Sequence, residues 1–292
     1  MKTQKSFEQK EQGTLYLVPT PIGNLDDMTF RAVAILKEVD FIASEDTRNT
    51  QKLLNHFEID THQLSYHEHN SKERTPQLVE KMLDGETIAQ VSDAGMPSIS
   101  DPGVDLVKAA LDAGIAVVPL PGPNAALTAL IASGLAPQPF YFYGFLPRKK
   151  KELVEQLNEC NKREETLIFY ESPHRIKKVV EQMIAVFGPQ RQIVLAREVT
   201  KRFEEFVRGS TQEVYEWLTE EQIRGEFVLI AEGNSEVDAE THETWEDLSL
   251  KEHVDFMIEE HNLPSKKAIK EVALLRDLPK REVYAAYHEI SG

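Results

Sequence analysis

A loop of twelve residues, Ser92–Gly103, carries the residue types best suited to hold a ligand. It follows the apolar run Thr87–Val91 and consists mostly of Ser, Asp, Gly and Pro. Because connections in α/β proteins usually take about two to six residues, a loop of this length is more typical of a binding segment. It contains no Lys or Arg, and its Asp93 and Asp101 suit hydroxyl groups or a cation better than phosphates. The sequence therefore predicts a polar ligand that is not rich in phosphate.

Similar turn-rich loops follow other apolar runs along the chain. They are Pro19–Asn24, Ser44–Arg48 and Pro121–Asn124 in the first half, and Glu171–Arg175 and Arg197–Lys201 in the second. In open α/β sheets, ligands bind at the edge formed by the carboxyl ends of the strands. We expect the loops to gather at two such edges, and two edges that face each other would form a deep cleft.

Several familiar site motifs are absent from the sequence. There is no G-x-G-x-x-G, G-x-x-x-x-G-K-[ST], G-x-S-x-G or C-x-x-C. This argues against a Rossmann dinucleotide enzyme, a P-loop NTPase, an α/β-hydrolase and a zinc ribbon. His67-Glu68-His69 resembles a fragment of a metal site, but no third ligand stands at a recognisable spacing. We expect a surface loop there and no metal ion.

The net charge of −16 argues against broad, non-specific binding to nucleic acids, which requires clustered Lys and Arg. Basic residues nevertheless gather at Arg148–Lys151, at His174–Lys178 and at Arg197 with Lys201-Arg202. A localised basic face and an ordinary solvated surface would both account for them.

The cellular compartment is predicted from three features that the sequence lacks: a cysteine pair, a membrane span and a signal peptide. The single cysteine, Cys160, cannot form an intramolecular disulfide. No apolar run approaches the ~18 residues of a membrane span, and Met1–Gln12 lacks the apolar core of a signal peptide. We expect a cytoplasmic protein with no membrane partner.

The elements that position the loops follow from the spacing of apolar residues. The first half alternates short apolar runs with amphipathic helical patterns, as in βαβ units with a mostly parallel sheet. The expected strands are Leu15–Val18, Phe41–Ala43, Thr87–Val91 and Ile115–Leu120. The expected helices are Met28–Glu38, Thr47–His56, Pro76–Leu83, Val104–Ala113 and an alanine-rich helix after Asn124.

A boundary is expected at Leu135–Pro139, where two prolines interrupt the pattern. The second half is predicted to be α+β or mixed, with antiparallel pairing where strands follow one another closely. Its expected strands are Phe140–Tyr143, Thr166–Tyr170, Gln192–Ala196, Phe203–Val207 and Phe227–Ala231. Its expected helices are Lys151–Asn161, His174–Phe187 and Thr211–Leu218.

Residues 234–247 carry six acids and no Lys or Arg, as a solvated linker does. Three helical patterns follow it, at Leu250–His261, Ser265–Leu275 and Lys280–Ile290. Their spacing fits a helix-turn-helix-like bundle, and equally a small cap or an oligomer contact. The predicted domains are therefore an N-terminal α/β domain at 13–135, a second α/β domain at 139–233, the acidic linker at 234–247 and a helical segment at 248–292.

Six of these segments together resemble the tetrapyrrole-methylase superfamily, and within it a branch that acts on ribosomal RNA. They are Val18–Asn24, Ser44–Arg48, Ser92–Gly103, Pro121–Ala125, Phe169–Arg175 and Gly225–Ile230. The motifs occur in the expected order and span about residues 13 to 233. No single motif would suffice for this assignment.

The resemblance implies two α/β domains of the class III methyltransferase type, with S-adenosylmethionine bound in a cleft between them. It also implies a homodimer that methylates the 2′-hydroxyl of a cytidine ribose in the decoding region of 16S rRNA, within the small ribosomal subunit. S-adenosylmethionine carries no phosphate, which agrees with a loop free of Lys and Arg. By position, the residues that would line the cofactor site are Pro21, Asp93, Gly95, Met96, Ser98, Ile99, Asn124, Ala125, Tyr170, Glu171 and Phe227. The chain departs from tetrapyrrole relatives at Gly95-Met96-Pro97, where they carry Gly-Asp-Pro, so Asp93 is a candidate substitute contact.

The implied reaction is an attack of the ribose oxygen on the methyl group of the sulfonium. Alignment of the reactants can supply ~7 to 11 kcal/mol, and a positioned general base adds ~10² to 10⁴ in rate. The candidate catalytic residues are Glu45, Asp46, Arg48, Glu198 and Lys201, with Glu171 as a further candidate base. The candidate RNA contacts are Arg148, Lys149, His174, Arg175 and Arg197. Salt-bridged loop scaffolding is an equally common role for each of these residues.

Two other functions compete with this one. A methyltransferase acting on a tetrapyrrole carbon would also use a basic cleft, because its substrate is a polycarboxylate, but it gives no role to Ser44–Arg48 or to a helical tail. A nucleic-acid-binding regulator acting through residues 248–292 would leave the two cleft-forming halves unexplained. The residues alone leave open the target nucleotide, the identity of the base, and the choice between free RNA and an assembled subunit.

Overall fold

The computed structural model describes residues 3–6, 11–235, 248–259, 263–276 and 278–288. The chain divides into two compact units. The larger comprises Met1–Asn161 with Glu165–Gly233, and the smaller comprises Lys162–Glu164 with Asn234–Gly292. The larger unit holds two five-stranded sheets, and the described residues of the smaller form three helices.

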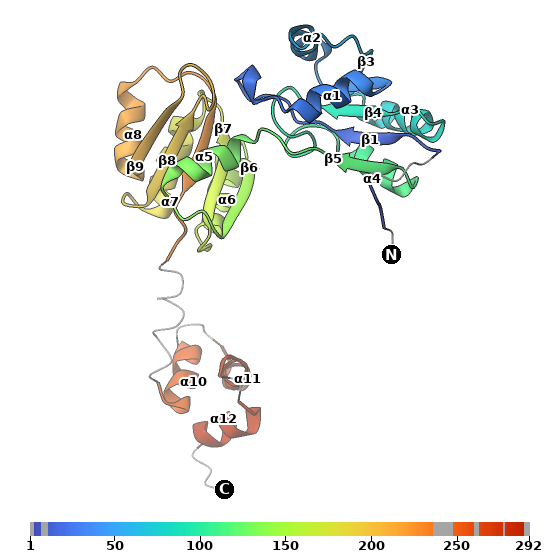
Figure 1. Cartoon of the computed structure of the whole chain (residues 1–292). Helices are drawn as coiled ribbons and strands as arrows, with labels where there is room; N and C mark the ends of the chain where they lie inside the picture. The colour runs from blue at the N-terminus through green and yellow to red at the C-terminus, as the bar shows by residue number, and fades with distance from the viewer. Residues whose placement is uncertain (1–2, 7–10, 236–247, 260–262, 277, 289–292) are drawn as a thin grey trace. The chain divides into compact units, whose positions relative to one another are not determined.

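The first sheet is entirely parallel, with the strand order β3-β2-β4-β1-β5 (Figure 1). Its strands are β1 (Thr14–Leu17), β2 (Phe41–Ser44), β3 (Gln63–Ser65), β4 (Ile88–Val91) and β5 (Ala116–Pro119). The helices between them are η1 (Leu25–Asp27), α1 (Phe30–Glu38), α2 (Thr47–His56), α3 (Ser71–Leu83) and α4 (Val104–Asp112). Because all strands run in one direction, their carboxyl ends share one edge, and the loops that follow β1, β2, β4 and β5 begin there.

Two hydrophobic clusters cover opposite faces of this sheet. Leu36 of α1 and Leu54 of α2 pack in the cluster that contains Ala89. Leu106 of α4 packs in the cluster that contains Ile88, together with residues of α3. Successive residues of a strand point to opposite faces, so α1 and α2 cover one face of the sheet and α3 and α4 cover the other.

The structure adds one short strand and lengthens one helix relative to the prediction. β3 is a three-residue edge strand whose polar sequence gives no alternating signal. α3 begins at Ser71, well before the predicted start at Pro76, although proline fits poorly in a helix interior. Thr75 is buried and its Oγ1 lies 3.0 Å from the hydroxyl of Tyr66. Burial of this first turn therefore outweighs the hydrogen bond that Pro76 cannot make.

The second sheet is mixed, with the strand order β6-β7-β10-β8-β9. β6 and β7 are parallel, whereas β10 is antiparallel to β7 and β8, and β8 to β9. The strands are β6 (Phe140–Phe145), β7 (Thr166–Glu171), β8 (Gln192–Arg197), β9 (Glu205–Ser210) and β10 (Phe227–Ala231). The helices are α6 (Lys150–Cys160), α7 (Ile176–Phe187) and α8 (Thr211–Glu220). The predicted fold class, two α/β halves with the second one mixed, is confirmed.

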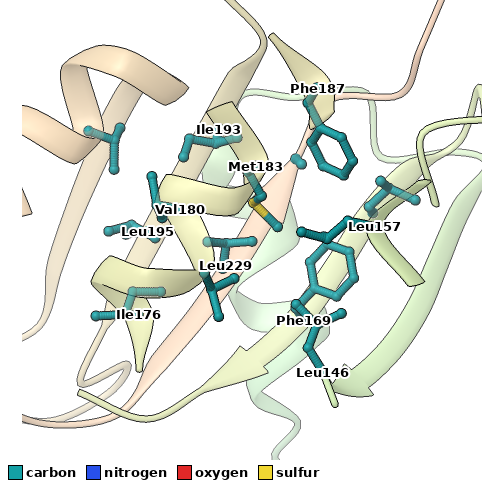
Figure 2. Close-up of a cluster of buried hydrophobic side chains, with 14 of the residues drawn as sticks. Leu146, Leu157, Phe169, Ile176, Val180, Met183, Phe187, Ile193, Leu195 and Leu229 are labelled. Atoms are coloured by element: carbon teal, nitrogen blue, oxygen red, sulfur yellow. The ribbon is translucent and has the colours of Figure 1, made fainter. Parts of the chain in front are cut away.

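The core of the second half lies between α7 and its sheet. Figure 2 shows Met183 of α7 beside Phe169 of β7 and Leu229 of β10, all completely buried. β9 starts two residues later than predicted, because Phe203 is exposed and stands in the loop before the strand.

Helix α5 (Ala125–Ser133) precedes the predicted boundary at Leu135–Pro139 but packs against the second sheet. Its Leu130 shares a hydrophobic cluster with Ile168 of β7. The guanidinium of Arg208 in β9 donates hydrogen bonds of 3.1 and 2.7 Å to two carbonyl oxygens in the last turn of α5. α5, the last helix before the predicted boundary, thus packs with the second half. The domain limits at 13–135 and 139–233 stay predictions.

The smaller unit contains α10 (Leu250–Glu259), α11 (Ser265–Leu275) and α12 (Lys280–Tyr287) around a small core that includes Val254, Ile269 and Val283. His253 is buried, and burial lowers its pKa to about 4, so its Nδ1 is free of a proton and accepts a hydrogen bond of 3.1 Å from Arg276 Nε. The three predicted C-terminal helices are present. The predicted linker lies outside the described residues from 236 onward, as do the predicted ends of the first and third helices.

Candidate active site

Three loops at the carboxyl edge of the first sheet are tied to one another. Thr20 and Gly95 exchange two backbone hydrogen bonds of 2.9 Å, which joins the loop after β1 to the loop after β4. The hydroxyl of Thr20 also donates to the carbonyl oxygen of Ser92 at 3.0 Å. Asn124 Nδ2 donates to Met96 Sδ at 3.6 Å, and the side-chain oxygen of Asn124 caps α5. These bonds make one wall out of segments that are far apart in the sequence.

A buried glutamine organises the long loop Ser92–Gly103. Gln90 is 1% exposed, and its Nε2 donates to the carbonyl oxygen of Pro102 at 2.8 Å and to Ser98 Oγ at 3.3 Å. Gly103 has a φ of +150°, and a methyl group at this position would overlap Gln90 Nε2. Only glycine fits here, because the loop folds back onto the glutamine amide.

A cavity of about 410 Å³ lies beside this wall. Loop residues of the first half line it, including Gly95 and Met96, together with residues of the second half such as Tyr170 and Phe227. Its charged lining consists of Lys201 and four carboxylates, those of Asp101, Glu171, Glu198 and Glu226. An excess of negative charge suits a cationic ligand and disfavours phosphate.

The cavity brings together most of the residues that were assigned to the cofactor. Those that line it are Gly95, Met96, Ile99, Asn124, Ala125, Tyr170, Glu171 and Phe227. Three others do not line it: Pro21 and Asp93 line a second hollow of about 200 Å³, and Ser98 lines a third. The roles of all eleven residues stay predictions.

Glu171 places a buried carboxylate in the cavity wall. Its side chain is 1% exposed, and its Oε1 accepts a hydrogen bond of 2.8 Å from the backbone N–H of Ser172. Its Oε2 accepts no hydrogen bond within the described residues and lies 3.5 Å from the guanidinium of Arg175. Burial raises the pKa of Glu171, and the hydrogen bond from Ser172 and the charge of Arg175 oppose that shift. One carboxylate oxygen is thus available for a hydrogen-bond donor of a ligand.

Arg175 has a structural role in addition to this ion pair. It donates to the carbonyl oxygens of Leu146 and Pro147 at 3.1 and 2.8 Å, and so holds the segment after β6 against the start of α7. These internal contacts already use much of the Arg175 guanidinium. The predicted contact of Arg175 with RNA stays a prediction, and it would have to be made in addition to them.

Lys201 joins two acids at the cavity. Its ammonium lies 2.9 Å from Glu198 Oε1 and 2.8 Å from Glu226 Oε2. Glu198 has a φ of +51° and Thr200 a φ of +68°, so this loop adopts a left-handed conformation that non-glycine residues seldom use. The hydrogen bonds of Glu198 Oε1 with Lys201 and with the backbone N–H of Glu226 hold the loop in place. We interpret Lys201 and Glu198 as positioned parts of the wall, with little free charge.

A second pair of acids, Asp101 and Glu45, lies in the loops that follow β4 and β2. Asp101 lines the cavity, and burial raises its pKa, with the Ser92 hydroxyl opposing the shift and the charge of Asp93 adding to it. Burial also raises the pKa of Glu45, and the negative charge of Asp101 adds to the shift. Glu45 Oε2 accepts a hydrogen bond of 3.3 Å from the backbone N–H of Asp93. A carboxylate with a raised pKa is the better general base near neutral pH.

Asp46 and Arg48 form an exposed pair. Arg48 donates from Nε at 3.0 Å and from a terminal nitrogen at 2.6 Å to the two carboxylate oxygens of Asp46, and its side chain is 87% exposed. These hydrogen bonds and the guanidinium charge hold the pKa of Asp46 well below its usual range. Asp46 is therefore a weak base, and neither residue lines the cavity.

The other predicted RNA contacts differ in how free their charges are. Arg148 and His174 are exposed, and Lys149 is exposed but lies 2.9 Å from Glu152. Arg197 donates to the carbonyl oxygen of Arg224 at 2.8 Å and to Glu205 at 3.2 Å, so it is held inside the second half.

Sequence reasoning left several cavity residues out of the candidate site. Ser100 and Asp101 belong to the loop Ser92–Gly103, and Glu226 belongs to the motif Gly225–Ile230. Their positions in these segments could have identified them as candidates. Phe145 is different, because its place in the lining depends on β6 and its neighbours in the sheet. Its ring contacts that of Tyr170 edge-on, with the centroids 5.6 Å apart.

Within the described ranges, no group of three or more His, Cys, Asp or Glu side chains is arranged to hold a metal ion. His67 and His69 lie in the turn before α3 with their ring centroids 5.9 Å apart. None of the helices in the described part of the chain is both long and apolar enough to span a membrane.

Residues 14–215 match the family model described as Tetrapyrrole (Corrin/Porphyrin) Methylases. The match covers the first sheet, the second sheet except β10, and most of the residues that line the cavity. The chain therefore belongs to the tetrapyrrole methylase family, a class of methyltransferases.

Relatives in this family match over nearly the whole chain. Ribosomal RNA small subunit methyltransferase I of Bacillus subtilis (strain 168) is 55% identical over 291 residues, which are 99% of this chain and 99% of the relative. The protein of the same name from Synechocystis sp. (strain ATCC 27184 / PCC 6803 / Kazusa) is 43% identical over 280 residues, 96% of this chain and 99% of the relative.

Solved structures show the same fold at low sequence identity. Uroporphyrin-III C-methyl transferase from Thermus thermophilus, complexed with S-adenyl homocysteine, has a TM-score of 0.54 and 18% identity and covers 77% of this chain and 100% of its own. Cobalt precorrin-4 methyltransferase, a cobalamin biosynthetic enzyme, has a TM-score of 0.57 and 19% identity and covers 75% of this chain and 94% of its own.

Proposed function

We propose that the chain transfers a methyl group from S-adenosylmethionine to the 2′-hydroxyl of a cytidine ribose in the decoding region of 16S rRNA. The observation that carries this proposal is the match to ribosomal RNA small subunit methyltransferase I over 99% of both chains. That match extends through residues 248–292, whereas the family model ends at residue 215. The cavity described above supplies a place for the cofactor.

The residues of the cavity fit the chemistry of S-adenosylmethionine. When bound, this cofactor supplies a methyl group on a positively charged sulfur. The four carboxylates of the lining favour a cation, and Glu171 Oε2 is a buried acceptor that lacks a hydrogen-bond donor among the described residues. The apolar side chains of Met96, Tyr170 and Phe227 fit a purine ring. Asn124 holds Met96 in this lining through the contact with its sulfur.

Asp101 is the carboxylate best placed to act as the general base. It lines the cavity, and burial raises its pKa toward the range where a base is effective. In the proposed reaction, Asp101 would take the proton of the ribose hydroxyl, and the ribose oxygen would accept the methyl group that bound S-adenosylmethionine would supply. The negative charge of Asp93 adds to the rise in the pKa of Asp101, because a nearby carboxylate disfavours the ionised form.

The charge of the cavity favours a ribose over a tetrapyrrole as the acceptor. A ribose is neutral, and the phosphates on either side of it can stay outside the cavity. A tetrapyrrole substrate would bring several carboxylates to a lining in which four carboxylates face a single cation, Lys201. Like charges at short distance are unfavourable, so a methyltransferase for tetrapyrroles is the weaker alternative.

The target class is tested with labelled S-adenosylmethionine and two acceptors. We expect label to enter small ribosomal subunits that lack this methyl group and not a uroporphyrinogen-type substrate. Fully modified subunits serve as the matched control and should take up no label. Resistance of one phosphodiester to alkaline cleavage would place the methyl group on a ribose oxygen. Label in the tetrapyrrole alone would contradict the proposal.

We further propose that the enzyme is a cytoplasmic homodimer that uses the outer face of α5. This helix is apolar on both sides: Leu130 packs inward, whereas Leu127 and Ile131 point outward and are 46% and 81% exposed. A helix that is hydrophobic all round is normally covered on all sides. A second copy of the chain, as expected for the family, would cover this face.

Ile131→Asp is expected to shift the protein from dimer to monomer, because a carboxylate would be buried without a partner in the interface. Sedimentation velocity measures the change. Lys108→Glu on α4, an exposed substitution away from α5, is the control and should stay dimeric. A monomeric wild-type protein would contradict the dimer.

A further inference from the structure

We propose that the exposed face of α2 is the surface on which the single-stranded RNA next to the target nucleotide lies. This inference rests on the proposed function. The α2 face consists of Arg48, Asn49, Gln51, Lys52, Asn55 and His56, all exposed. α2 begins immediately after the loop that carries Glu45 and Asp46.

The composition of α2 sets it apart from the rest of the chain. The helix contains no carboxylate, although the protein as a whole carries 49 Asp and Glu against 33 Lys and Arg. Its buried side consists of Thr50, Leu53 and Leu54, which pack against the first sheet. Everything that it exposes is a cation, an amide or an imidazole. Such side chains contact phosphates, sugars and the edges of unpaired bases.

The amides on this face are already held in place by one another. Ser44 Oγ donates to Gln63 Oε1 at 2.9 Å, and Gln63 Nε2 donates to Gln51 Oε1 at 2.7 Å. Gln51 Nε2 in turn donates to Asn55 Oδ1 at 2.8 Å. The chain of bonds starts at the buried end of β2, next to the loop of Glu45, and runs out to the surface. Amides that are ordered before binding lose less side-chain entropy when they contact RNA.

The cations on this face have different neighbours. Lys52 Nζ lies 3.4 Å from Asn49 Oδ1 and has no ion-pair partner in the part of the chain that the structure describes. Asn49 Nδ2 donates to Asp93 Oδ2 at 2.9 Å, which occupies that carboxylate. Arg48 is paired with Asp46 along one side of its guanidinium and is otherwise open to solvent. Lys52 is therefore the main phosphate contact.

Hollows border α2 on both sides. One, of about 200 Å³, is lined by Lys52 and Asn49 together with Pro21 and Asp93. Pro21 and Asp93 belong to the loops after β1 and β4, and other residues of these two loops line the cavity. The other is lined by Arg48 and Gln51 among others, and Asp60 is the carboxylate in its lining. A strand that crosses α2 would thus reach the loops of the cavity wall through the first hollow.

Lys52→Glu tests this surface in the full-length protein. The probe is the small ribosomal subunit without the methyl group, and its binding is measured by filter retention at several salt concentrations. We expect Lys52→Glu to weaken binding on the order of tenfold at low salt and to reduce the salt dependence by about one counterion. Lys108→Glu makes the same charge change on α4, which covers the opposite face of the same sheet, and should bind as the wild type does. The affinity for S-adenosylmethionine should be unchanged in both.

Equal binding by Lys52→Glu and Lys108→Glu would overturn the proposal. Gln51→Ala combined with Asn55→Ala is a second variant that keeps the charge, and it should weaken binding with an unchanged salt dependence. The methyl label decides the proposed function separately. If wild-type protein binds subunits through Lys52 but transfers no label, the proposed function fails and the α2 surface stands. A wild-type protein that binds no subunits would overturn both.

Discussion

Asp101→Asn is expected to slow methyl transfer by about 10²- to 10⁴-fold, the usual contribution of a positioned general base. The amide has nearly the same shape but cannot take the proton of the attacking hydroxyl. Because Asp101 has a raised pKa, wild-type turnover should fall as the pH drops through that pKa, where the carboxylate becomes protonated. The variant should lose this acidic limb. Single-turnover rates with saturating cofactor and subunits, measured from acidic to neutral pH, would show both effects.

Three measurements separate this role from a structural one. The affinity of Asp101→Asn for S-adenosylmethionine, measured by calorimetry, should remain that of the wild type. Asp105→Asn is the matched control, because Asp105 is exposed in the first turn of α4 and does not line the cavity. Asp46→Asn should have a smaller effect than Asp101→Asn, because Asp46 is held as a weak base by Arg48. Turnover by Asp101→Asn at the wild-type rate would remove Asp101 from the mechanism.

Glu171→Gln is expected to weaken the binding of S-adenosylmethionine by about 10- to 150-fold, which corresponds to ~1.5 to 3 kcal/mol for a hydrogen bond to a charged group. The glutamine keeps the size of the side chain but removes the buried negative charge from the lining. Calorimetric titration with the cofactor measures the change. Affinity in the wild type should fall as the pH is lowered through the raised pKa of Glu171, and the variant should lack this dependence.

The same carboxylate predicts how stability depends on pH in the absence of cofactor. A raised pKa means that the folded chain holds the Glu171 proton more tightly than the unfolded chain does. The contribution of Glu171 to the free energy of unfolding therefore falls as the pH rises from its ordinary value of 4.5 through the raised value. Glu171→Gln should flatten this part of the stability curve in chemical denaturation. Glu181→Gln, an exposed carboxylate on α7, is the control. If Glu171→Gln instead binds S-adenosylmethionine as tightly as the wild type does, Glu171 has only a structural role.

The sequence by itself determined the alternation of strands and helices, because apolar spacing depends on local burial. It also predicted loops whose residues line the cavity. Ser92–Gly103 is too long for a simple connection and free of cations, and its Gly95, Met96 and Ile99 line the cavity. Antiparallel pairing in the second sheet was predicted from another local feature, the short connections between successive strands. Family membership followed from the order of motifs and is now shown.

Tertiary structure decided which charges are free. Arg175 and Arg197 stood in basic clusters, but backbone carbonyls and acids from distant segments hold them inside the second half. Asp46 and Asp101 are the same residue type in comparable loops, yet Arg48 lowers the pKa of the first and burial raises that of the second. Lys52 lay in an ordinary helix pattern, and only packing shows that it is exposed on a face without carboxylates. Charge, hydrogen bonding and burial depend on neighbours that are remote in the chain. Residue types alone therefore named the candidates, and the fold decided which of them line the cavity and which charges are paired.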